Sequence, residues 1–316
     1  MLNKISKKKF NLLLKNKKNE DLDFLKFSED FLIKKRGFIF KQPKKGDKVI
    51  LLLSGGIDSV VAWAVLMKVY GYQVYPVIID RGSNKRAKRE LSAVRYFEKY
   101  FSKKYPEQYI RPFHLSVNTV AKEIIDTLDK NNITPEDIVL NYKENKFLAE
   151  DNSNVVIARA KGVSPYLMPF YGVVYSDYLK FIKGLDIHTI LVGVNFSDGI
   201  VVSSQTFTAL RSTLLSMCVA TDNYKWNFSS VFLERETGVY MDKLEIIKLG
   251  NKLGIPLKRT WSCYNDGIMQ CGDSCATCID RKRSFYLAGI KDETYYRPYL
   301  FRLIKDKVKS WVFFFK

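Results

Sequence analysis

Short, mostly apolar runs alternate with longer amphipathic runs through most of the chain. Residues 49–53 and 73–79 have the length and composition of buried strands, whereas the apolar positions of residues 57–70 recur at helical spacing. Further strands are expected at residues 109–115 and 188–194. Further helices are expected at residues 85–101, 119–128, 165–182, 207–220 and 242–253. This alternation predicts right-handed βαβ units, and therefore an α/β fold with a Rossmann-like parallel sheet covered by helices on both faces.

Changes in composition divide the chain into four segments. Residues 1–46 are rich in Lys, Asn and Phe but contain short apolar groups, so we expect a basic N-terminal extension that forms a small docking element. Residues 47–255 are expected to form the catalytic domain, in which the polar residues 131–155 form an insertion near the mouth of the site. Residues 256–290 contain a cysteine cluster, and residues 291–316 form an aromatic and basic tail.

The charge of the chain is strongly positive. Of its 316 residues, 52 are Lys or Arg and 33 are Asp or Glu, which gives a formal net charge of +19. Such an excess attracts polyanions, so the basic N-terminus could contact nucleic acid or protein, but a lysine-rich proteome explains the same numbers. No apolar run has the length of a membrane-spanning helix, and the basic N-terminus lacks the apolar block of a secretory signal. We therefore expect a cytoplasmic protein without membrane contact, and we leave a homodimer open.

Residues 54–59 read Ser-Gly-Gly-Ile-Asp-Ser and join the first predicted strand to its helix. Gly55 and Gly56 allow a sharp turn that brings backbone N–H groups close to a phosphate, and the helix dipole points its positive end at the same place. The hydroxyl groups of Ser54 and Ser59 could donate to phosphate oxygens. Asp58 would be repelled by phosphate, so it is expected to brace the loop or to contribute to a Mg²⁺ site. This loop matches neither a kinase-type phosphate loop nor a dinucleotide fingerprint.

Four of the five cysteines lie close together near the C-terminus. They are Cys263, Cys271, Cys275 and Cys278. Four thiolates at this spacing, with Gly267 and Gly272 to permit tight turns, predict a closed tetrahedral Zn²⁺ site of the structural kind. An iron–sulfur cluster is the competing interpretation, because the Cys-x-x-Cys spacing is common to both. The fifth cysteine, Cys218, lies in an apolar helical stretch and is expected to be a small core residue.

Residues 54–59, placed directly after a buried strand, resemble the pyrophosphate loop of the ATP pyrophosphatase superfamily, whose members split ATP into AMP and pyrophosphate. Within that superfamily, the Thr-Trp-Ser-Cys-Tyr segment at residues 260–264 and the cysteines that follow it resemble the 7-cyano-7-deazaguanine synthase family. The Gly-Val-Asn segment at residues 193–195 and the predicted helix that begins near Lys243 resemble the same family. The likeness runs discontinuously from about residue 49 to residue 290.

The resemblance implies an ATP-dependent ligase that forms a carbon–nitrogen bond. In the family, the carboxylate of 7-carboxy-7-deazaguanine attacks the α-phosphate of ATP to give an acyl-adenylate and pyrophosphate. An amine then displaces AMP; in the biosynthetic enzymes the amine is ammonia, and a second ATP-driven step converts the amide to a nitrile. The loop would hold the departing pyrophosphate, with Mg²⁺ and a lysine sharing its charge. The implied cofactors are ATP, Mg²⁺ and Zn²⁺.

The resemblance also assigns site residues. The catalytic residues are expected to be Asp58, Ser59 and Lys243. The nucleotide-binding residues are expected to be Leu53, Ser54, Gly55, Gly56, Ile57, Asp58, Ser59, Val60 and Val61. Asn195, Asp198 and Arg159 are candidates for contact with the substrate, although a turn aspartate and an ordinary surface arginine explain the last two equally well.

Two family motifs are replaced in this chain. A Pro-Gly-Arg-Asn stretch appears as Pro-Phe-Tyr-Gly at residues 169–172, and a Gly-Tyr-Pro-Asp-Cys-Arg segment is replaced from residue 196 onward. In the family, these segments surround the base and carboxylate pocket. Together with the N-terminal extension, the replacements suggest a diverged form, like relatives in antiphage operons that join the activated deazaguanine to the amine of a partner protein.

Two other functions compete with this interpretation. A tRNA-modifying thiolase or ligase of the same superfamily is consistent with the positive charge, and iron in place of zinc would favour it. A zinc-stabilised nucleic-acid-binding module without activity is disfavoured by the intact loop at residues 54–59. The only histidines, His114 and His188, are expected to be structural, so a Ser–His–Asp mechanism is disfavoured.

Overall fold

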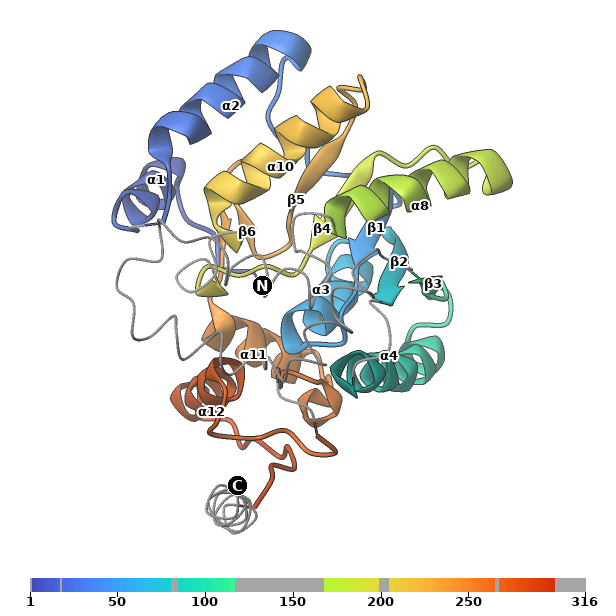
Figure 1. Cartoon of the computed structure of the whole chain (residues 1–316), viewed down its shortest axis with the longest axis vertical. Helices are drawn as coiled ribbons and strands as arrows, with labels where there is room; N and C mark the ends of the chain where they lie inside the picture. Colours follow the sequence, from blue (N-terminus) through green and yellow to red (C-terminus); the bar gives the residue numbers. More distant parts are fainter. Residues whose placement is uncertain are drawn as a thin grey trace, which may run out of the picture.

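A five-stranded parallel sheet forms the centre of the protein, in the order β3-β2-β1-β4-β5 (Figure 1). The strands are β1 (Lys48–Leu52), β2 (Gln73–Asp80), β3 (Phe113–Ser116), β4 (Thr189–Val192) and β5 (Asn227–Ser230). The strand order reverses beside β1, so the loops after β1 and β4 diverge at a topological switch point, where open α/β sheets bind ligands. The computed structural model describes residues 2–17, 19–80, 85–116, 168–198, 205–264 and 267–298.

Helices cover both faces of the sheet, as the sequence predicts. The side chains of β1 alternate: Val49 and Leu51 point into one core cluster, and Ile50 and Leu52 into the other. Because both faces are covered, β1 is apolar throughout its buried length. The helices that pack on the first face are α3 (Ile57–Lys68), α4 (Lys85–Lys104) and α11 (Lys243–Lys252). Those on the second are α8 (Met168–Lys183) and α10 (Phe207–Ala220).

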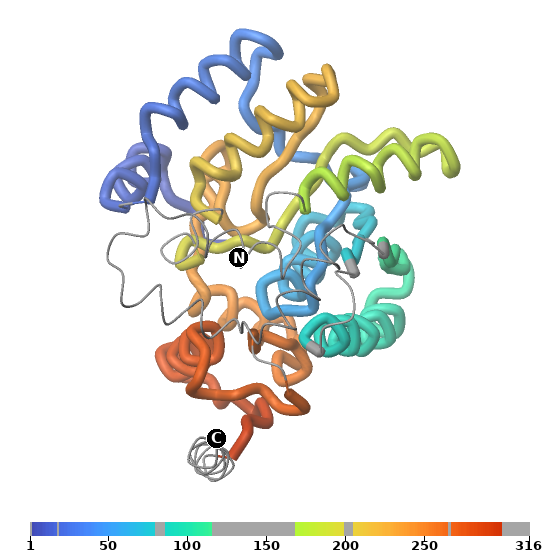
Figure 2. The backbone as a smooth tube through the Cα atoms, in the orientation of Figure 1, coloured from blue at the N-terminus to red at the C-terminus, as the bar shows by residue number. Residues whose placement is uncertain are grey.

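The N-terminal residues belong to the second core cluster. Helix α1 (Lys7–Lys15) buries Phe10 and Leu14, and α2 (Leu22–Arg36), which packs against α10, buries Leu25 and Leu32. The tube in Figure 2 shows this dark blue segment lying along the same side of the molecule as α10. Before α1, Ile5 donates its backbone N–H to the carbonyl of Gly238 at 2.8 Å, beside the hairpin of β6 (Leu233–Glu234) and β7 (Val239–Tyr240). The extension is thus packed onto the sheet domain itself.

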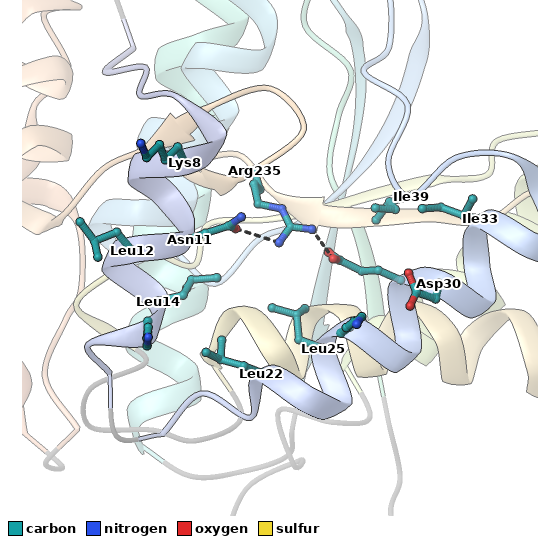
Figure 3. Close-up of a pocket in the computed structure, with 13 residues that line it drawn as sticks. Lys8, Asn11, Leu12, Leu14, Leu22, Leu25, Asp30, Ile33, Ile39 and Arg235 are labelled. Carbon is teal, nitrogen blue, oxygen red and sulfur yellow. Dashed lines mark hydrogen bonds and ion pairs between the residues drawn. The ribbon is translucent and has the colours of Figure 1, made fainter.

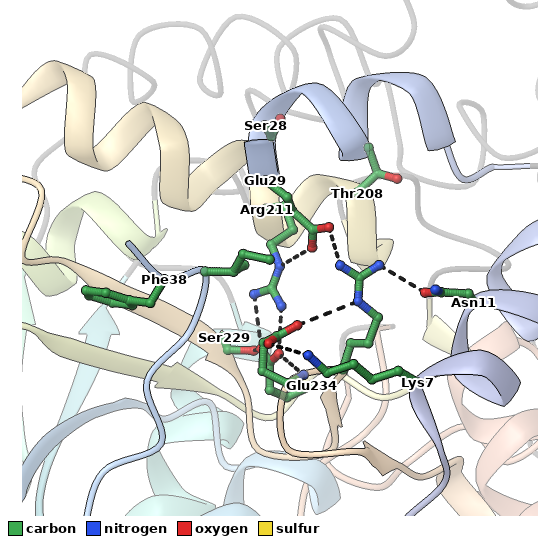
Figure 4. A network of polar contacts seen from close by, with 12 residues as sticks. Lys7, Asn11, Ser28, Glu29, Phe38, Thr208, Arg211, Ser229 and Glu234 are labelled. Carbon is green, nitrogen blue, oxygen red and sulfur yellow. Dashed lines mark hydrogen bonds and ion pairs between the residues drawn. The ribbon is translucent and has the colours of Figure 1, made fainter. Parts of the chain in front are cut away.

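A buried network of charged groups ties the extension to the domain (Figure 4). The guanidinium group of Arg211, on α10, is fully buried and donates to Glu234 at 2.6 and 3.0 Å and to Glu29 at 3.1 Å. Glu29 lies on α2 and also accepts from Arg235, which in turn donates to Asn11 on α1 at 3.0 Å. Each buried charge therefore has an opposite charge beside it.

Replacing Arg211 by Met should lower the free energy of unfolding by about 3–5 kcal/mol, because buried Glu234 would lose its counter-ion and Glu29 would keep only Arg235. Urea denaturation measures this loss. The matched control is Lys258→Ala, which removes an exposed ion pair with Glu293 and should cost less than about 0.5 kcal/mol. A loss below about 1 kcal/mol for Arg211→Met would contradict the structural role assigned to the network.

Most predicted elements are confirmed, and several of their boundaries differ in the structure. The strand expected at residues 109–115 begins only at Phe113, while Tyr109 packs near Trp63 at 6.1 Å between ring centroids, and the strand expected to reach residue 194 ends at Val192. The helix expected to reach residue 70 ends at Lys68, and the one expected to reach residue 101 continues to Lys104. The helix expected from residue 165 is described from Met168, and the start predicted for it lies outside the described residues. The predicted helix at residues 119–128, the insertion at 131–155 and the end of the tail lie outside the described residues.

In the part of the chain that the structure describes, no helix combines the length and the apolar character needed to cross a membrane.

Candidate active site and metal centre

The loop between β1 and α3 has the geometry of an anion-binding turn. Gly55 adopts φ = +78°, and a Cβ placed there would lie 2.6 Å from the carbonyl oxygen of Glu90, so only glycine fits. Gly56 is the N-cap of α3 and offers no side chain to bond the first amide groups of the helix. These N–H groups, at the positive end of the α3 dipole, are therefore left for a ligand.

The two serines of the loop are used to hold its shape. The hydroxyl of Ser59 donates to the carbonyl of Gly56 and accepts from the backbone N–H of Ser54, both at 3.2 Å. The hydroxyl of Ser54 lies 3.1 Å from that of Ser59. Because Ser59 is buried and its single proton is used inside the loop, it braces the turn in this structure and does not point a free donor at a phosphate.

The end of β4 touches the start of α3. A Cβ on Gly193 would lie 2.8 Å from the carbonyl carbon of Asp58 and 2.8 Å from the nitrogen of Ser59. The glycine of the Gly-Val-Asn segment is therefore required by a close backbone approach. This contact brings the loop after β4 beside the anion-binding turn, at the switch point of the sheet.

Lys243 and Asp58 form an ion pair in the site. Lys243 is the first residue of α11, whose start is fixed by a capping box between Asp242 and Glu245. Burial alone would lower the pKa of Lys243, but the attraction of Asp58 outweighs it and raises that pKa above its ordinary value. Burial raises the pKa of Asp58 to about 6 despite the attraction of Lys243. The ammonium group of Lys243 is therefore kept positively charged and is fixed beside the loop between β1 and α3.

The loop after β4 is organised by Asn195. Its side chain is completely buried, its carbonyl oxygen accepts from the N–H of Ser197 at 2.8 Å, and its amide donates to Asp198 at 2.8 Å. Asn195 therefore holds the loop in shape in this structure, and its contact with a substrate stays a prediction. Asp198 is partly exposed, and its carboxylate also accepts the backbone N–H of Asn195 at 3.0 Å. Arg159, the third predicted substrate residue, lies outside the described residues.

Two residues near the site were missed by sequence reasoning. Asp280 lies on α12 (Ala276–Ala288), and its pKa is raised by burial, although the charge of Lys243 opposes this. Its position two residues after the Cys-x-x-Cys pair is a signal that could have drawn attention to it. Lys17, just after α1, donates to the backbone carbonyl of Phe196 and lies 3.4 Å from the centre of the Phe196 ring. Burial lowers the pKa of Lys17 to about 8, although Glu20 and Asp198 attract its proton. No sequence pattern reveals a contact across this distance along the chain.

Replacing Lys17 by Met should loosen the loop after β4 and raise the KM for the substrate of this site about tenfold, with little change in kcat, because Lys17 holds the loop and not the reacting atoms. Steady-state kinetics measure both constants. Lys17→Arg keeps a charged donor and should restore most of the affinity, and Lys9→Met on α1 is the matched control. Equal KM values for Lys17→Met and the unaltered chain would show that Lys17 does not position the loop after β4.

A small hollow opens beside the anion-binding loop, at the carboxyl ends of β1 and β2 and under the start of α4. On α4, the guanidinium of Arg86 lies 3.9 Å from the centre of the Tyr264 ring, and this contact joins α4 to the cysteine segment. The hollow is lined by Leu53, Ser54, Ile78, Ile79, Ala87, Glu90, Leu91 and Met168. Its volume of about 20 Å³ is close to that of a single water molecule, so the hollow is a small gap beside the loop and not a nucleotide-sized pocket in this structure. Val60 and Val61, also predicted to bind nucleotide, are fully buried in α3, and their part in nucleotide binding stays a prediction.

The four clustered cysteines converge as predicted. The sulfur atoms of Cys263, Cys271, Cys275 and Cys278 all lie within 4.8 Å of one another and could hold a metal ion. Gly272 turns with φ = +82° between them.

The cysteine segment contacts the anion-binding loop, because Trp261 donates its backbone N–H to the carbonyl of Gly55 at 2.9 Å. Arg281, buried on α12, donates to Thr260 and to the carbonyl of Leu257, both at 2.8 Å, and so fixes the segment to the domain.

The remaining cysteine and the histidines lie elsewhere. Cys218 is completely buried in the core on α10, as expected. His114 lies beside Glu98, at 3.1 Å between its Nε2 and the carboxylate, and His188 packs edge-on against Trp226. Neither histidine contacts the anion-binding loop in the interactions of the described residues.

Fold and site together define an α/β protein with an anion-binding turn at the switch point of a parallel sheet, a lysine–aspartate pair beside it and a four-cysteine centre braced against it. The family model for "Queuosine biosynthesis protein QueC" matches residues 48–289, so the chain belongs to the QueC family. A 7-cyano-7-deazaguanine synthase of Thermoplasma acidophilum is 27% identical over 254 residues, which cover 80% of this chain and 93% of that protein. The synthase of Methanocaldococcus jannaschii is 27% identical over 261 residues, covering 79% and 99% of the two chains.

Among solved structures, a U34-tRNA thiolase from Methanococcus maripaludis with a [4Fe-4S] cluster aligns with a TM-score of 0.34 at 14% identity. It covers 84% of this chain and 73% of the thiolase. A likeness at this level carries no argument about the site.

Proposed function

We propose that the chain uses ATP to adenylate the carboxylate of 7-carboxy-7-deazaguanine and then transfers the acyl group to an amine. The observation that carries the proposal is the charged Lys243, held by Asp58 beside the uncapped start of α3, in a chain of the QueC family. A departing pyrophosphate requires such a combination of backbone donors and fixed positive charge.

In the first step a carboxylate oxygen attacks the α-phosphorus of ATP, and the bond from that phosphorus to the bridging oxygen breaks to release pyrophosphate. The first amides of α3 and the ammonium of Lys243 stabilise the charge that develops on the leaving group. In the second step the amine nitrogen attacks the acyl carbon, loses a proton and displaces AMP, which leaves an amide. Asp58 keeps Lys243 charged and directed at the loop through both steps.

The residues present suit a Mg²⁺ ion next to the phosphates. The Oδ1 atom of Asp58 is buried and has no hydrogen-bond partner in the structure, and a carboxylate oxygen together with substrate phosphates is the ligand set that Mg²⁺ prefers. Asp58 would hold the ion through this oxygen. When bound, Mg²⁺ supplies further positive charge to the phosphates.

The four-cysteine centre suits Zn²⁺ in a structural role. A tetrahedron with Zn–S bonds of about 2.3 Å brings its sulfur atoms within about 4 Å of one another. The sulfur atoms of this chain, all within 4.8 Å, match that spacing. A four-iron cluster must fit four irons and four sulfides between its thiolates and needs wider separations. The close spacing of the four sulfur atoms favours the amide-forming enzyme over the tRNA thiolase. Iron found by metal analysis would instead support the thiolase.

The acceptor in this chain is proposed to be the amine of a partner protein in place of ammonia. In the segment that replaces Pro-Gly-Arg-Asn, Pro169 and Gly172 are buried, and a Cβ on Gly172 would lie 3.0 Å from the Ile190 side chain. The start of α8 therefore packs on the sheet and offers no arginine or asparagine there. A changed pocket of this kind supports a product other than the free nitrile.

Mass spectrometry of the products from ATP, 7-carboxy-7-deazaguanine and either ammonia or a co-encoded protein tests the proposal. The expected result is pyrophosphate release with the carboxylate and a mass increase on the protein. Free 7-cyano-7-deazaguanine formed from ammonia at ordinary enzymatic rates would overturn the partner-protein acceptor. No carboxylate-dependent pyrophosphate release would overturn the adenylation itself.

A further inference from the structure

Helices α1 and α2 enclose an apolar groove on the surface of the N-terminal extension, with a volume of about 650 Å³ and Arg235 at its back (Figure 3). We call it the α1–α2 groove. Its aliphatic lining consists of Leu12, Leu14, Leu22, Leu25, Ile33 and Ile39. Of these, Leu12 is 59%, Leu22 39% and Ile33 46% exposed. Exposed aliphatic side chains gathered around one hollow are typical of a binding surface. All the residues that line the groove, except Arg235, precede residue 48, where the family match begins.

The groove is held in a fixed shape by the buried network. Arg235 joins its two walls, because it donates to Asn11 on α1 and to Glu29 on α2. Glu29 is fixed in turn by the fully buried Arg211 at 3.1 Å. Figure 3 shows Arg235 reaching between the two helices toward Asn11. A surface whose walls are already joined loses little conformational entropy when it binds.

The charges that line the groove favour an acidic partner. Lys8, Lys15 and Lys26 line it, together with Asp30. The remaining charged lining residues, Arg235 and Glu29, form an ion pair with each other. Helix α1 contains no acidic residue at all in its sequence KKKFNLLLK. Positive charge around an aliphatic floor complements a segment with apolar residues on one face and Asp or Glu beside them.

We propose that the α1–α2 groove binds an amphipathic, acidic segment of a partner protein. The apolar side chains of that segment enter between α1 and α2, and its carboxylates meet Lys8, Lys15 and Lys26. A nucleic acid suits the groove less well, because none of its lining residues is aromatic and its one guanidinium, on Arg235, is already engaged.

The position of the groove relates it to the active site. Helix α1 forms one wall, and Lys17, just beyond its end, contacts the loop after β4 through the carbonyl of Phe196. A protein bound in the groove is therefore anchored to the same helix that supports this loop. The inference concerns binding alone, and it holds whether or not the bound protein supplies the amine.

Two synthetic helical peptides of about 18 residues test the proposal on the full chain. They share a leucine face, which in one peptide is flanked by Glu and in the other by Lys. Fluorescence anisotropy should show that the Glu peptide binds about tenfold more tightly than the Lys peptide, and less tightly as salt increases. The double variant Leu12→Asp and Leu22→Asp should weaken binding of the Glu peptide about tenfold or more. Lys15→Glu with Lys26→Glu should remove the preference between the peptides.

The control variant Phe181→Asp changes a 79% exposed side chain on α8 and should bind the Glu peptide like the unaltered chain. Each variant should also keep its unfolding temperature and its ATP–pyrophosphate exchange, so that a folding defect or inactive chemistry is recognised separately. Equal binding of the two peptides, or unchanged binding by the groove variants, would overturn the proposal. So would a single-stranded oligonucleotide that binds more tightly than the Glu peptide and loses affinity in the groove variants.

Discussion

Replacing Lys243 by Met should lower the rate of carboxylate-dependent pyrophosphate release by about a hundredfold or more, because it removes the fixed positive charge beside the leaving group. The loss should appear mainly in kcat, since the charge on the leaving group develops in the transition state. Asp58 would also lose its counter-ion, and its pKa, already raised to about 6 by burial, would rise further. Pyrophosphate release measured at saturating ATP checks the prediction.

Two variants make this test specific. Lys248→Met removes an exposed lysine from the same helix, α11, and should leave the rate within about twofold. Lys243→Arg keeps the charge but changes its geometry, so an intermediate rate is expected. If Lys243→Met retained more than about a third of the rate of the unaltered chain, Lys243 would have no part in stabilising the leaving group.

Replacing Cys278 by Ser should abolish stoichiometric zinc binding and lower the free energy of unfolding by about 3 kcal/mol or more, because the binding energy of a structural zinc is also folding energy. Cys278 lies in the first turn of α12 and is completely buried. Since the same segment donates a hydrogen bond from Trp261 to Gly55, ATP-dependent activity should fall together with the metal content.

The matched control is Cys218→Ala, which removes a buried cysteine from the core on α10 and should leave one metal ion per chain. Elemental analysis and thermal unfolding measure the two properties. Retention of one zinc by Cys278→Ser, or equal stability of the zinc-loaded and chelator-treated chain, would show that the centre is not a structural zinc site.

The sequence was informative where structure is decided locally. The strand before Ser54 and the helix after Gly56 follow from hydrophobic periodicity, and the turn between them requires glycine, so the anion-binding loop could be placed from the sequence. The cysteine cluster was equally visible, because its four members lie within 16 residues of one another. Such features depend on spacing along the chain and need no knowledge of distant contacts.

What the sequence did not reveal depends on residues brought together from far apart. Lys17 meets Phe196 across 179 positions, and Arg211 meets Glu29 across 182. The complete burial of Asn195 was also hidden, because a polar residue after a strand looks the same whether it faces a ligand or supports the loop. The packing of the extension onto the sheet domain could not be predicted either, because it depends on contacts with residues far along the chain, such as those of Phe10 and Leu14 in the second core cluster.

The shared charge network makes the sheet domain of this chain dependent on the extension. Arg211 lies on a helix of the part that matches the family, but one of its two carboxylate partners, Glu29, lies before that part. Removal of the residues before β1 would leave Arg211 with Glu234 alone and would uncover Phe207 and Leu233, which now pack in the same cluster as Phe10 and Leu14. A truncated chain is therefore expected to lose stability in the sheet domain itself, so the two parts should unfold together and not one after the other.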